Sequence, residues 1–461
     1  MSTLPQEIQK GSNVPAEQLN IPALTDPISA DSTPLFVEYL RRGAKPADDW
    51  RCGVEFEVFG YEADTLERLD AAQVQTVLAG FAASTDDLIY EGHTIVEASV
   101  TGGAGRVTVE PGGQVEFSGA PQRTLAGVER ELKRYLTRLR EIGESNGFIF
   151  LATGFDPLRT IREQRWFPKA RYGVMRPYLA TRGRRAWDMM CRTAAIQANF
   201  DYDSEDDLAK KFILGNRLAP IVTAIFANSP FEDGQLSGYK STRAAVWLET
   251  DDDRTGLAPP ALTDDFSLAA FVEYVRGVPM LFARREERYL DGPTGISFGE
   301  FLERGCGDIS PVFGDWVDHL TTIFTDARLK QHIELRNADS GSLSIALALQ
   351  ALWKGLIYDR DALDEALRVA PSLNSTDAVF LREAVARDGL AAHVVGVNVL
   401  GLAKEIVALA ASGLERIAPG EARYLDVLRA QVIEDEVCPA DILLRNWHGS
   451  IKNVIEQARV T

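Results

Sequence analysis

The sequence predicts an α+β protein with an antiparallel sheet and a mostly helical C-terminal third. Several short segments alternate strictly between apolar and polar residues, which is typical of strands with one buried face. Two of these segments, RVTVE and QVEFSG, flank the loop Pro111-Gly112-Gly113, a connection suited to an antiparallel hairpin. From Gly341 onward, apolar residues recur mostly at helical spacing instead.

Composition limits the kind of protein this chain can be. Its 461 residues are 45% hydrophobic and 25% charged, enough for a large core. The 49 Lys and Arg against 67 Asp and Glu give a net charge of −18, which does not favour nucleic acid or an anionic membrane as a partner. No apolar run is both long enough and uncharged enough to span a membrane. We expect a loosely attached arm over residues 1–30 and one large domain over residues 31–461.

The cysteines and the N-terminal segment suggest a location. Cys52, Cys191, Cys306 and Cys438 form no C-x-x-C pair and have no nearby histidine spacing for zinc. They are typical of reduced thiols, and the N-terminus has neither a secretory pattern nor enough arginine for a transit peptide. We therefore expect a cytoplasmic protein without a disulfide switch.

The first expected elements are a helix, a strand, the hairpin, a second helix and a further strand. DSTP offers a cap and an early proline for a short helix in LFVEYLRRG. In the strand CGVEFEVFGYE, Val54, Phe56 and Val58 share one face, and Glu55 and Glu57 share the other. After the hairpin, RTLAGVERELKRYLTRLREIGESNG predicts an amphipathic helix that a glycine ends, and FIFLATGF predicts a buried strand.

Two later strands repeat the alternation. AIQANFDY places Gln197, Asn199 and Asp201 on one face and leads into a capped helix in SEDDLAKKFILGN. QHIELRNAD places Glu334 and Arg336 on one face. Each of these strands therefore presents polar side chains on a single side of the predicted sheet.

The polar faces together carry many oxygen ligands. Strand by strand, they are Glu55 and Glu57; Glu110, Gln114 and Glu116; Gln197 and Asn199; and Glu334. Residues i and i+2 of a strand lie roughly 6.5 Å apart, a spacing that suits two neighbouring cations. Oxygen donors without Cys or clustered His favour Mg²⁺, with Mn²⁺ as the alternative, and Mg²⁺ commonly arrives with nucleotide phosphates. The competing interpretation is that each strand simply has a solvated face.

Two arginines differ from the scattered basic residues. Arg243 and Arg336 each lie in an otherwise apolar stretch, where arginine is usually paired or grips a carboxylate or phosphate. Arg171 belongs to a denser basic run that a solvated surface would also explain. The chain lacks a phosphate-binding G-x-x-x-x-G-K-[ST] loop, a dinucleotide fingerprint, H-E-x-x-H and G-x-S-x-G. Any bound nucleotide would therefore be held through metal ions on the sheet.

Seven collinear motifs resemble the plant and proteobacterial type of glutamate-cysteine ligase. In chain order they are VEPGGQVEFSGAP, KARYGVMRPYL, DMMCRTAAIQANFDYDSEDD, IFANSPFEDG, STRAAVW, DDDRTG and HLTTIFTDARLKQHIELRNAD. The resemblance extends from about Cys52 to Asp339 and has a plausible helical continuation, so it covers most of the chain. It implies a glutamine synthetase-like fold, in which a curved antiparallel sheet forms a cup flanked by helices.

The resemblance also implies a reaction. The γ-carboxyl of glutamate would be joined to the amine of cysteine through a γ-glutamyl phosphate, with ATP and Mg²⁺, as the first step of glutathione or related thiol biosynthesis. The partners would be these small molecules, and the protein would be a monomer or a homodimer. Two alternatives remain open: a γ-glutamyl ligase for another amine, and a catalytically silent homologue that acts as a binding protein.

Residue roles follow from the same resemblance. The implied magnesium ligands are Glu55, Glu57, Glu110, Gln197 and Glu334. The implied catalytic residues are Arg171, Arg243 and Arg336, and the implied substrate-binding residues are Arg171, Met175, Arg243 and Trp247. Further candidates are Gln114, Glu116, Asn199 and Asp201, of which Glu116 or Asp201 would take the proton of the incoming amine.

The sequence departs from the family pattern in places. The family usually has E-H-E-K-F-G where this chain has E-F-E-V-F-G, so Phe56 and Val58 replace a histidine and a lysine on the apolar face. ELRNADSG likewise replaces the more usual E-M-R-G-A-D-G-G. The second change lies close to the expected substrates and bears on the identity of the acceptor amine.

Overall fold

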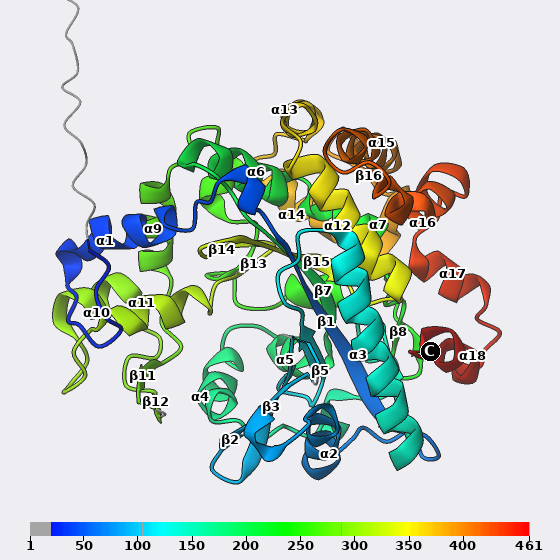
Figure 1. The fold of residues 1–461 in the computed structure, drawn as a ribbon, viewed down its shortest axis with the longest axis horizontal. Helices are drawn as coiled ribbons and strands as arrows, with labels where there is room; N and C mark the ends of the chain where they lie inside the picture. The colour runs from blue at the N-terminus through cyan, green and yellow to red at the C-terminus, as the bar shows by residue number, and fades with distance from the viewer. Residues whose placement is uncertain (1–19, 101, 104, 287, 461) are drawn as a thin grey trace, which may run out of the picture.

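The fold consists of one large antiparallel sheet with helices packed around it (Figure 1). The computed structural model describes residues 20–100, 102–103, 105–286 and 288–460. Within them, the sheet has nine strands in the order β14-β15-β7-β1-β5-β4-β3-β2, and β6 also pairs with β1. The strands are β1 (Cys52–Glu62), β2 (Leu88–Glu91), β3 (Thr94–Ser99), β4 (Arg106–Val109), β5 (Val115–Ser118), β6 (Phe148–Leu151), β7 (Ala195–Phe200), β14 (Ala327–Leu329) and β15 (Ile333–Asp339).

Helices cover the sheet and form most of the C-terminal part. Up to the last central strand they are α1 (Thr33–Arg41), α2 (Ala71–Phe81), α3 (Leu125–Asn146), α4 (Ala170–Leu179), α5 (Ala186–Arg192), α6 (Glu205–Arg217), α7 (Ala219–Ile225), α8 (Thr242–Trp247), α9 (Leu268–Gly277), α10 (Phe298–Arg304) and α11 (Phe313–Leu320). After that strand they are α12 (Leu343–Ile357), α13 (Arg360–Val369), α14 (Ser375–Asp388), α15 (Val399–Ile417), α16 (Asp426–Leu428), α17 (Pro439–Arg445) and α18 (Ile451–Ala458). The predicted α+β class with an antiparallel sheet is confirmed.

Local sequence signals explain where the main elements begin and end. The predicted hairpin is β4–β5, in which Val107 lies opposite Phe117. α3 begins after Thr124, whose side chain accepts a hydrogen bond from Gly127 N, and ends at Gly147 with φ 72°. Glycine adopts that left-handed conformation without the steric cost that other residues incur.

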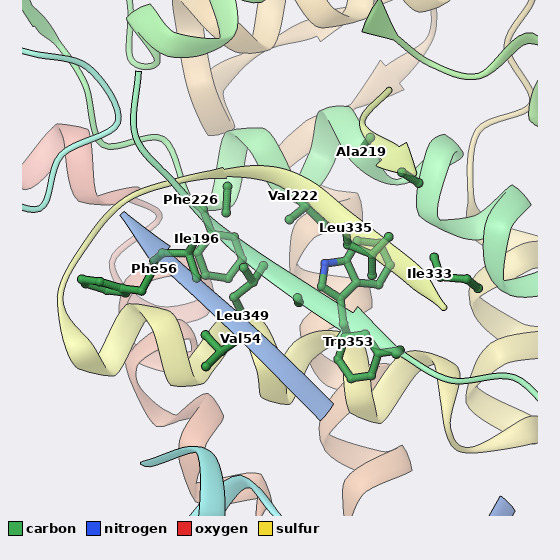
Figure 2. Close-up of a cluster of buried hydrophobic side chains, with 14 of the residues drawn as sticks. Val54, Phe56, Ile196, Ala219, Val222, Phe226, Ile333, Leu335, Leu349 and Trp353 are labelled. Carbon is green, nitrogen blue, oxygen red and sulfur yellow. The ribbon is translucent and has the colours of Figure 1, made fainter. Parts of the chain in front are cut away.

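The apolar face of the central strands packs on helices from two parts of the chain (Figure 2). Val54 and Phe56 of β1 and Leu335 of β15 are buried there. Opposite them lie Leu349 and Trp353 of α12, which are also buried. Because side chains alternate along a strand, burying this face turns the glutamates of β1 to the other side of the sheet.

The last residues of the expected N-terminal arm are packed against the domain rather than loosely attached. Phe313 N donates to Asp26 O at 2.9 Å, and Ile28 N donates to Pro311 O at 3.2 Å. The Ile28 side chain is buried in the main core. These contacts hold residues 26–28 against the start of α11, so packing begins before residue 31. Residues 1–19 of the expected arm lie outside the described residues.

None of the helices in the described ranges is long and apolar enough to cross a membrane.

Candidate active site

Strand register brings the glutamates of the polar face together. Pairing of β1 with β5 sets Glu57 opposite Glu116. Pairing of β1 with β7 sets Glu55 opposite Gln197. Directly opposed residues on antiparallel strands have Cβ atoms about 5 Å apart. Oxygen donors from distant parts of the sequence therefore share one surface.

A cavity of about 350 Å³ opens over this surface. Most of the residues singled out from the sequence line it: Glu55, Glu57, Glu110, Gln114, Glu116, Arg171, Met175, Gln197, Arg243, Trp247 and Arg336. Among the residues that the structure describes, Asn199, Asp201 and Glu334 do not line this cavity. The structure thus brings together residues of β1, the β4–β5 hairpin, α4, β7, α8 and β15.

The buried carboxylates repel one another. Burial, followed by the charges of Glu334 and Glu116, raises the pKa of Glu55 to about 7. Burial and the Glu110 charge likewise raise the pKa of Glu116 to about 7. The pKa of Glu57 is raised well above its usual value by burial, Glu116 and Glu110. A cation among these groups would stabilise their charged forms.

The donor set fits a hard cation such as magnesium. The wall supplies carboxylate oxygens and the Gln197 amide but no Cys or His. Nearby, Asn199 Nδ2 donates to Glu55 at 3.0 Å, while its buried Oδ1 has no hydrogen-bond partner. No group of three or more His, Cys, Asp or Glu within the described ranges is already arranged to hold a metal. Gln197 instead bridges Glu57 and Arg336, at 3.2 Å and 2.5 Å.

Glu334 was expected to be a metal ligand, but its carboxylate is already paired with cationic side chains. Its fully buried carboxylate accepts hydrogen bonds from Arg328 at 3.1 and 2.5 Å, and forms ion pairs with Lys330 at 2.9 Å and with Arg336. Although burial acts to raise it, these three cations hold the pKa of Glu334 well below its usual value. The β14–β15 register sets Arg328 directly opposite Glu334, which explains the pairing.

Arg243 enters the cavity as a buried cation with free donors. Its Nη2 donates to the Arg336 carbonyl at 2.7 Å, and it forms no ion pair with any residue the structure describes. Burial lowers the pKa of Arg243, while the charge of Asp339 opposes that change. Asp339 also accepts from the Ser241 hydroxyl at 2.9 Å, and Ser241 caps α8. This link fixes the start of α8 and hence the position of Arg243.

Helix α4 places Arg171 on another wall. Arg171 Nη2 donates to the Thr321 hydroxyl at 3.1 Å, and its Nε lies 3.4 Å from the Met175 sulfur. The Tyr172 hydroxyl donates to the Val109 carbonyl at 2.5 Å, which fastens α4 to the β4–β5 hairpin. The helix and the carboxylate-bearing hairpin are therefore positioned together.

One part of the wall is made of sulfur and aromatic groups. Met175, Met189 and Met190 line the cavity beside Trp247 and Phe324. The Trp247 and Phe324 rings lie 6.2 Å apart. The buried indole Nε1 of Trp247 has no hydrogen-bond partner. This polarisable wall suits a small apolar or sulfur-containing group.

Gln114 holds the hairpin turn. Its Oε1 accepts from Gly112 N at 2.9 Å, and its Nε2 donates to the carbonyls of Thr193 at 2.9 Å and Met190 at 3.2 Å. Arg68 donates to the Gly112 carbonyl at 2.8 Å. The polar groups of Gln114 are thus used within the protein.

The structure separates the two residues considered as proton acceptors. Asp201 accepts from Lys45 Nζ at 2.6 Å and from Arg51 N at 2.8 Å, away from the cavity. Glu116 lines the cavity and accepts from the Thr108 hydroxyl at 2.8 Å.

Several lining residues were missed by the sequence reasoning. They are Lys169, Tyr172, Thr321, Arg328 and Lys330. Arg328 and Lys330 have the same i, i+2 spacing in DARLKQHIELRN as Glu334 and Arg336, so strand alternation could have identified them.

Comparison with known proteins shows the family. Residues 51–457 match the family model described as Glutamate-cysteine ligase family 2. Glutamate-cysteine ligase A, chloroplastic, of Oryza sativa subsp. indica is 38% identical over 443 residues, covering 94% of this chain and 88% of the relative. The chloroplastic glutamate-cysteine ligase of Arabidopsis thaliana is 37% identical over 438 residues, covering 92% and 81%.

A solved structure supports the fold. Glutamate-cysteine ligase from Francisella tularensis, solved in complex with AMP, superposes with a TM-score of 0.55 at 14% identity, covering 89% of this chain and 87% of that one. At this identity the likeness concerns the fold, and it agrees with the expected fold class.

The expected cytoplasmic location is wrong by this comparison. Both plant relatives are named chloroplastic, which contradicts the inference of a cytoplasmic protein. Reduced cysteines were a weak basis for that expectation, because they indicate only a reducing environment.

The family model covers most of the chain, and the plant relatives match nearly all of it. Five of the seven motifs that support the resemblance also contribute residues to one cavity; IFANSPFEDG and DDDRTG do not. The chain therefore belongs to glutamate-cysteine ligase family 2.

Proposed function

We propose that the chain joins the γ-carboxyl of glutamate to the amine of cysteine, using ATP and Mg²⁺, to give γ-glutamylcysteine. The observation that best supports this reaction is that one cavity carries negative groups on one part of its wall and a positive group on another. Buried glutamates lie on one part of its wall, and the unpaired guanidinium of Arg243 lies on another. A metal-bound phosphate and a substrate carboxylate need these two kinds of group.

Glu55, Glu57 and Glu110, with the Gln197 amide, would hold the magnesium. The bound metal would neutralise part of the triphosphate charge. Glu334 would instead hold Arg328, Lys330 and Arg336 in place for the phosphates.

In the first step, a γ-carboxylate oxygen of glutamate attacks the γ-phosphorus of ATP. The bond to the β–γ bridging oxygen breaks, and ADP leaves. Phosphoryl transfer requires positioning and charge neutralisation more than covalent participation by the protein. Arg243 and Arg171 would orient the glutamate carboxylates, and Arg336 would stabilise charge on the transferring group.

In the second step, the cysteine amine attacks the acyl carbon of γ-glutamyl phosphate, and phosphate leaves. The amine must lose a proton to form a neutral amide. Glu116 is the residue we assign to take it, because it lines the cavity and Asp201 does not. The wall of Met175, Met189, Met190 and Trp247 supports a thiol-bearing acceptor.

The test is ADP release by the purified chain with Mg²⁺, ATP and glutamate, with and without cysteine. We expect release to require both amino acids. Stronger stimulation by another amine would replace the acceptor and keep the chemistry, and no release with any amine would indicate a silent homologue.

The Arg243→Gln variant tests the substrate assignment in the same assay. It should raise the KM for glutamate at least about tenfold, since a charge-assisted bond to the substrate is lost. Arg106→Gln is the matched control, because Arg106 pairs with Glu97 at the surface. An equal effect of both substitutions would contradict the assignment of Arg243.

A further inference from the structure

A second cavity lies behind the central sheet. Its volume is about 860 Å³, against about 350 Å³ for the candidate active site. Phe56 lines it, whereas Glu55 and Glu57, its neighbours in β1, line the other cavity. Because alternate side chains of a strand point to opposite faces, the two cavities lie on opposite sides of β1. The replacement of the family's usual histidine by Phe56 therefore concerns this second cavity.

The cavity lies where α3, the start of α12 and the C-terminal helices meet. Leu136 comes from α3, Leu343 from the first turn of α12, and Leu443 from α17. Figure 1 shows α17 and α18 at the edge of the molecule toward which the chain end lies. A volume in this range and a mixed apolar and polar wall are typical of small-molecule sites.

The charges of the wall are all of one sign. The described lining residues include Lys133 and Arg459 but no Asp or Glu, in a chain whose net charge is −18. Lys133 pairs with Glu129 at 2.6 Å, while Arg459 forms no ion pair within the described ranges. The N-terminal turn of α12 lies in the same wall and adds the positive end of its dipole.

One acceptor in this wall lacks a donor. Gln431 lines the cavity, and its buried Oε1 has no hydrogen-bond partner. A buried carbonyl without a partner costs free energy that a ligand N–H would recover. The cavity therefore combines a cationic mouth, an apolar body and one unused acceptor.

We propose that this cavity is a second binding site, for a small organic anion that has an apolar body and an N–H donor. The acidic group lies near Arg459 and Lys133, and the body packs on Leu136, Leu343 and Leu443. The N–H donates to Gln431. Because the sheet separates the two cavities, such a ligand does not compete with ATP or glutamate.

The dye 1-anilinonaphthalene-8-sulfonate has this chemistry, with a sulfonate, aromatic rings and an anilino N–H. Fluorescence titration of the native full chain should show one saturable site, unchanged by saturating Mg²⁺, ATP and glutamate. Arg459→Glu should weaken binding roughly tenfold, about 1.4 kcal/mol, because it reverses the free charge at the mouth. Leu443→Trp, which fills the apolar body, should weaken it further.

Arg445→Glu is the matched control, since Arg445 is exposed on the same helix as Leu443 and outside the cavity wall. It should change the affinity less than twofold. Equal weakening by Arg445→Glu and Arg459→Glu, or displacement of the dye by ATP and glutamate, would overturn the proposal. Non-saturable binding by a chain with a normal unfolding transition would also overturn it. ADP release is assayed separately, so failure of this site leaves the proposed ligase reaction untouched.

Discussion

Glu55 shows how a functional carboxylate can oppose stability. Its raised pKa means that the folded chain disfavours the charge that the side chain carries in water. The neighbouring Glu116 has its pKa raised to about 7 by burial and by Glu110. Such a cluster gains from a cation, which would turn the repulsion into binding free energy.

Glu55→Gln should separate activity from stability. The substitution keeps an oxygen that can accept from Asn199 and removes one buried charge. We expect Mg²⁺-dependent ADP release to fall about 100-fold, in the range seen when one electrostatic stabiliser is removed. The thermal midpoint without metal should stay the same or rise. Calorimetry and the ADP assay on one preparation measure both effects.

Glu97→Gln is the control for this substitution. Glu97 lies on β3 opposite Thr108, on the same face of the sheet but outside the cavity wall. Its activity should remain within about twofold of the unchanged chain. A similar loss in both variants would mean that charge anywhere on this face matters, contrary to the assignment of Glu55.

His319 should make the fold sensitive to acid. Burial and the Arg254 charge lower its pKa to about 3, while Nε2 bonds the Val275 carbonyl at 3.0 Å. The unfolded histidine, with its ordinary pKa of about 6.5, takes up a proton first as the pH falls. The stability linked to neutral His319 is therefore complete above pH 6.5 and is lost as the pH falls toward 3.

We expect His319 to account for a loss of about 2 kcal/mol between pH 6.5 and 5. His319→Gln should lower stability at neutral pH, since the stacking on Phe298 is lost, yet flatten the dependence in this interval. Urea unfolding at several pH values measures the slope. An unchanged slope in the variant would refute the role of His319.

Among the elements, the β4–β5 turn is tightly packed at Gly112. A Cβ on Gly112 would lie 2.3 Å from the Cys191 carbonyl oxygen, and the Gly112 carbonyl accepts from buried Arg68. Arg68 is itself held by Asp156 at 2.8 Å. The glycine permits the close approach that brings Glu110 and Glu116 to the cavity.

Gly112→Ala should therefore destabilise the chain by about 1–3 kcal/mol, as overpacking usually does, and lower its activity as the hairpin shifts. Gly173→Ala is the matched control, because a Cβ at Gly173 in α4 meets nothing within 4 Å. The control should be neutral or slightly stabilising. Thermal unfolding of both variants decides the point, and equal midpoints would contradict this account of the turn.

The elements themselves were largely predictable. Alternation identified β1, β5, β7 and β15, and the cap at Ser204 marked the start of α6. These signals depend only on neighbouring residues, so they can be recognised in one sequence without knowledge of the tertiary contacts. The packing of Ile28 was missed because its partners lie near Pro311, far along the chain.

The sequence could predict that a residue lines the cavity only where alternation along a strand shows which face its side chain is on. Glu55, Glu57 and Glu116 follow from alternation and the hairpin. The sequence could not show that Glu334 is already paired with Arg328, because this pairing depends on the register between β14 and β15. The position of Arg243 depends on tertiary contacts of α8 rather than on any periodic pattern.

At the scale of the whole molecule, one core connects the start and the end of the chain. The main hydrophobic cluster includes Ile28, Phe56 and Trp353 and continues to Ala440. We therefore propose that the catalytic domain expected over residues 31–461 also includes residues 26–28 and unfolds as one unit, and we predict one cooperative thermal transition. Far-ultraviolet circular dichroism and tryptophan fluorescence should give coincident curves, and two separated transitions would indicate independent units.

The central claim is that the cavity activates the γ-carboxyl of glutamate as an acyl phosphate. Glutamate labelled with ¹⁸O in that carboxyl group tests it directly, because one carboxyl oxygen leaves with phosphate when the amine attacks. Mass spectrometry of the phosphate formed with Mg²⁺, ATP and cysteine should show one ¹⁸O per molecule of γ-glutamylcysteine. Unlabelled phosphate accompanying product formation would contradict the account.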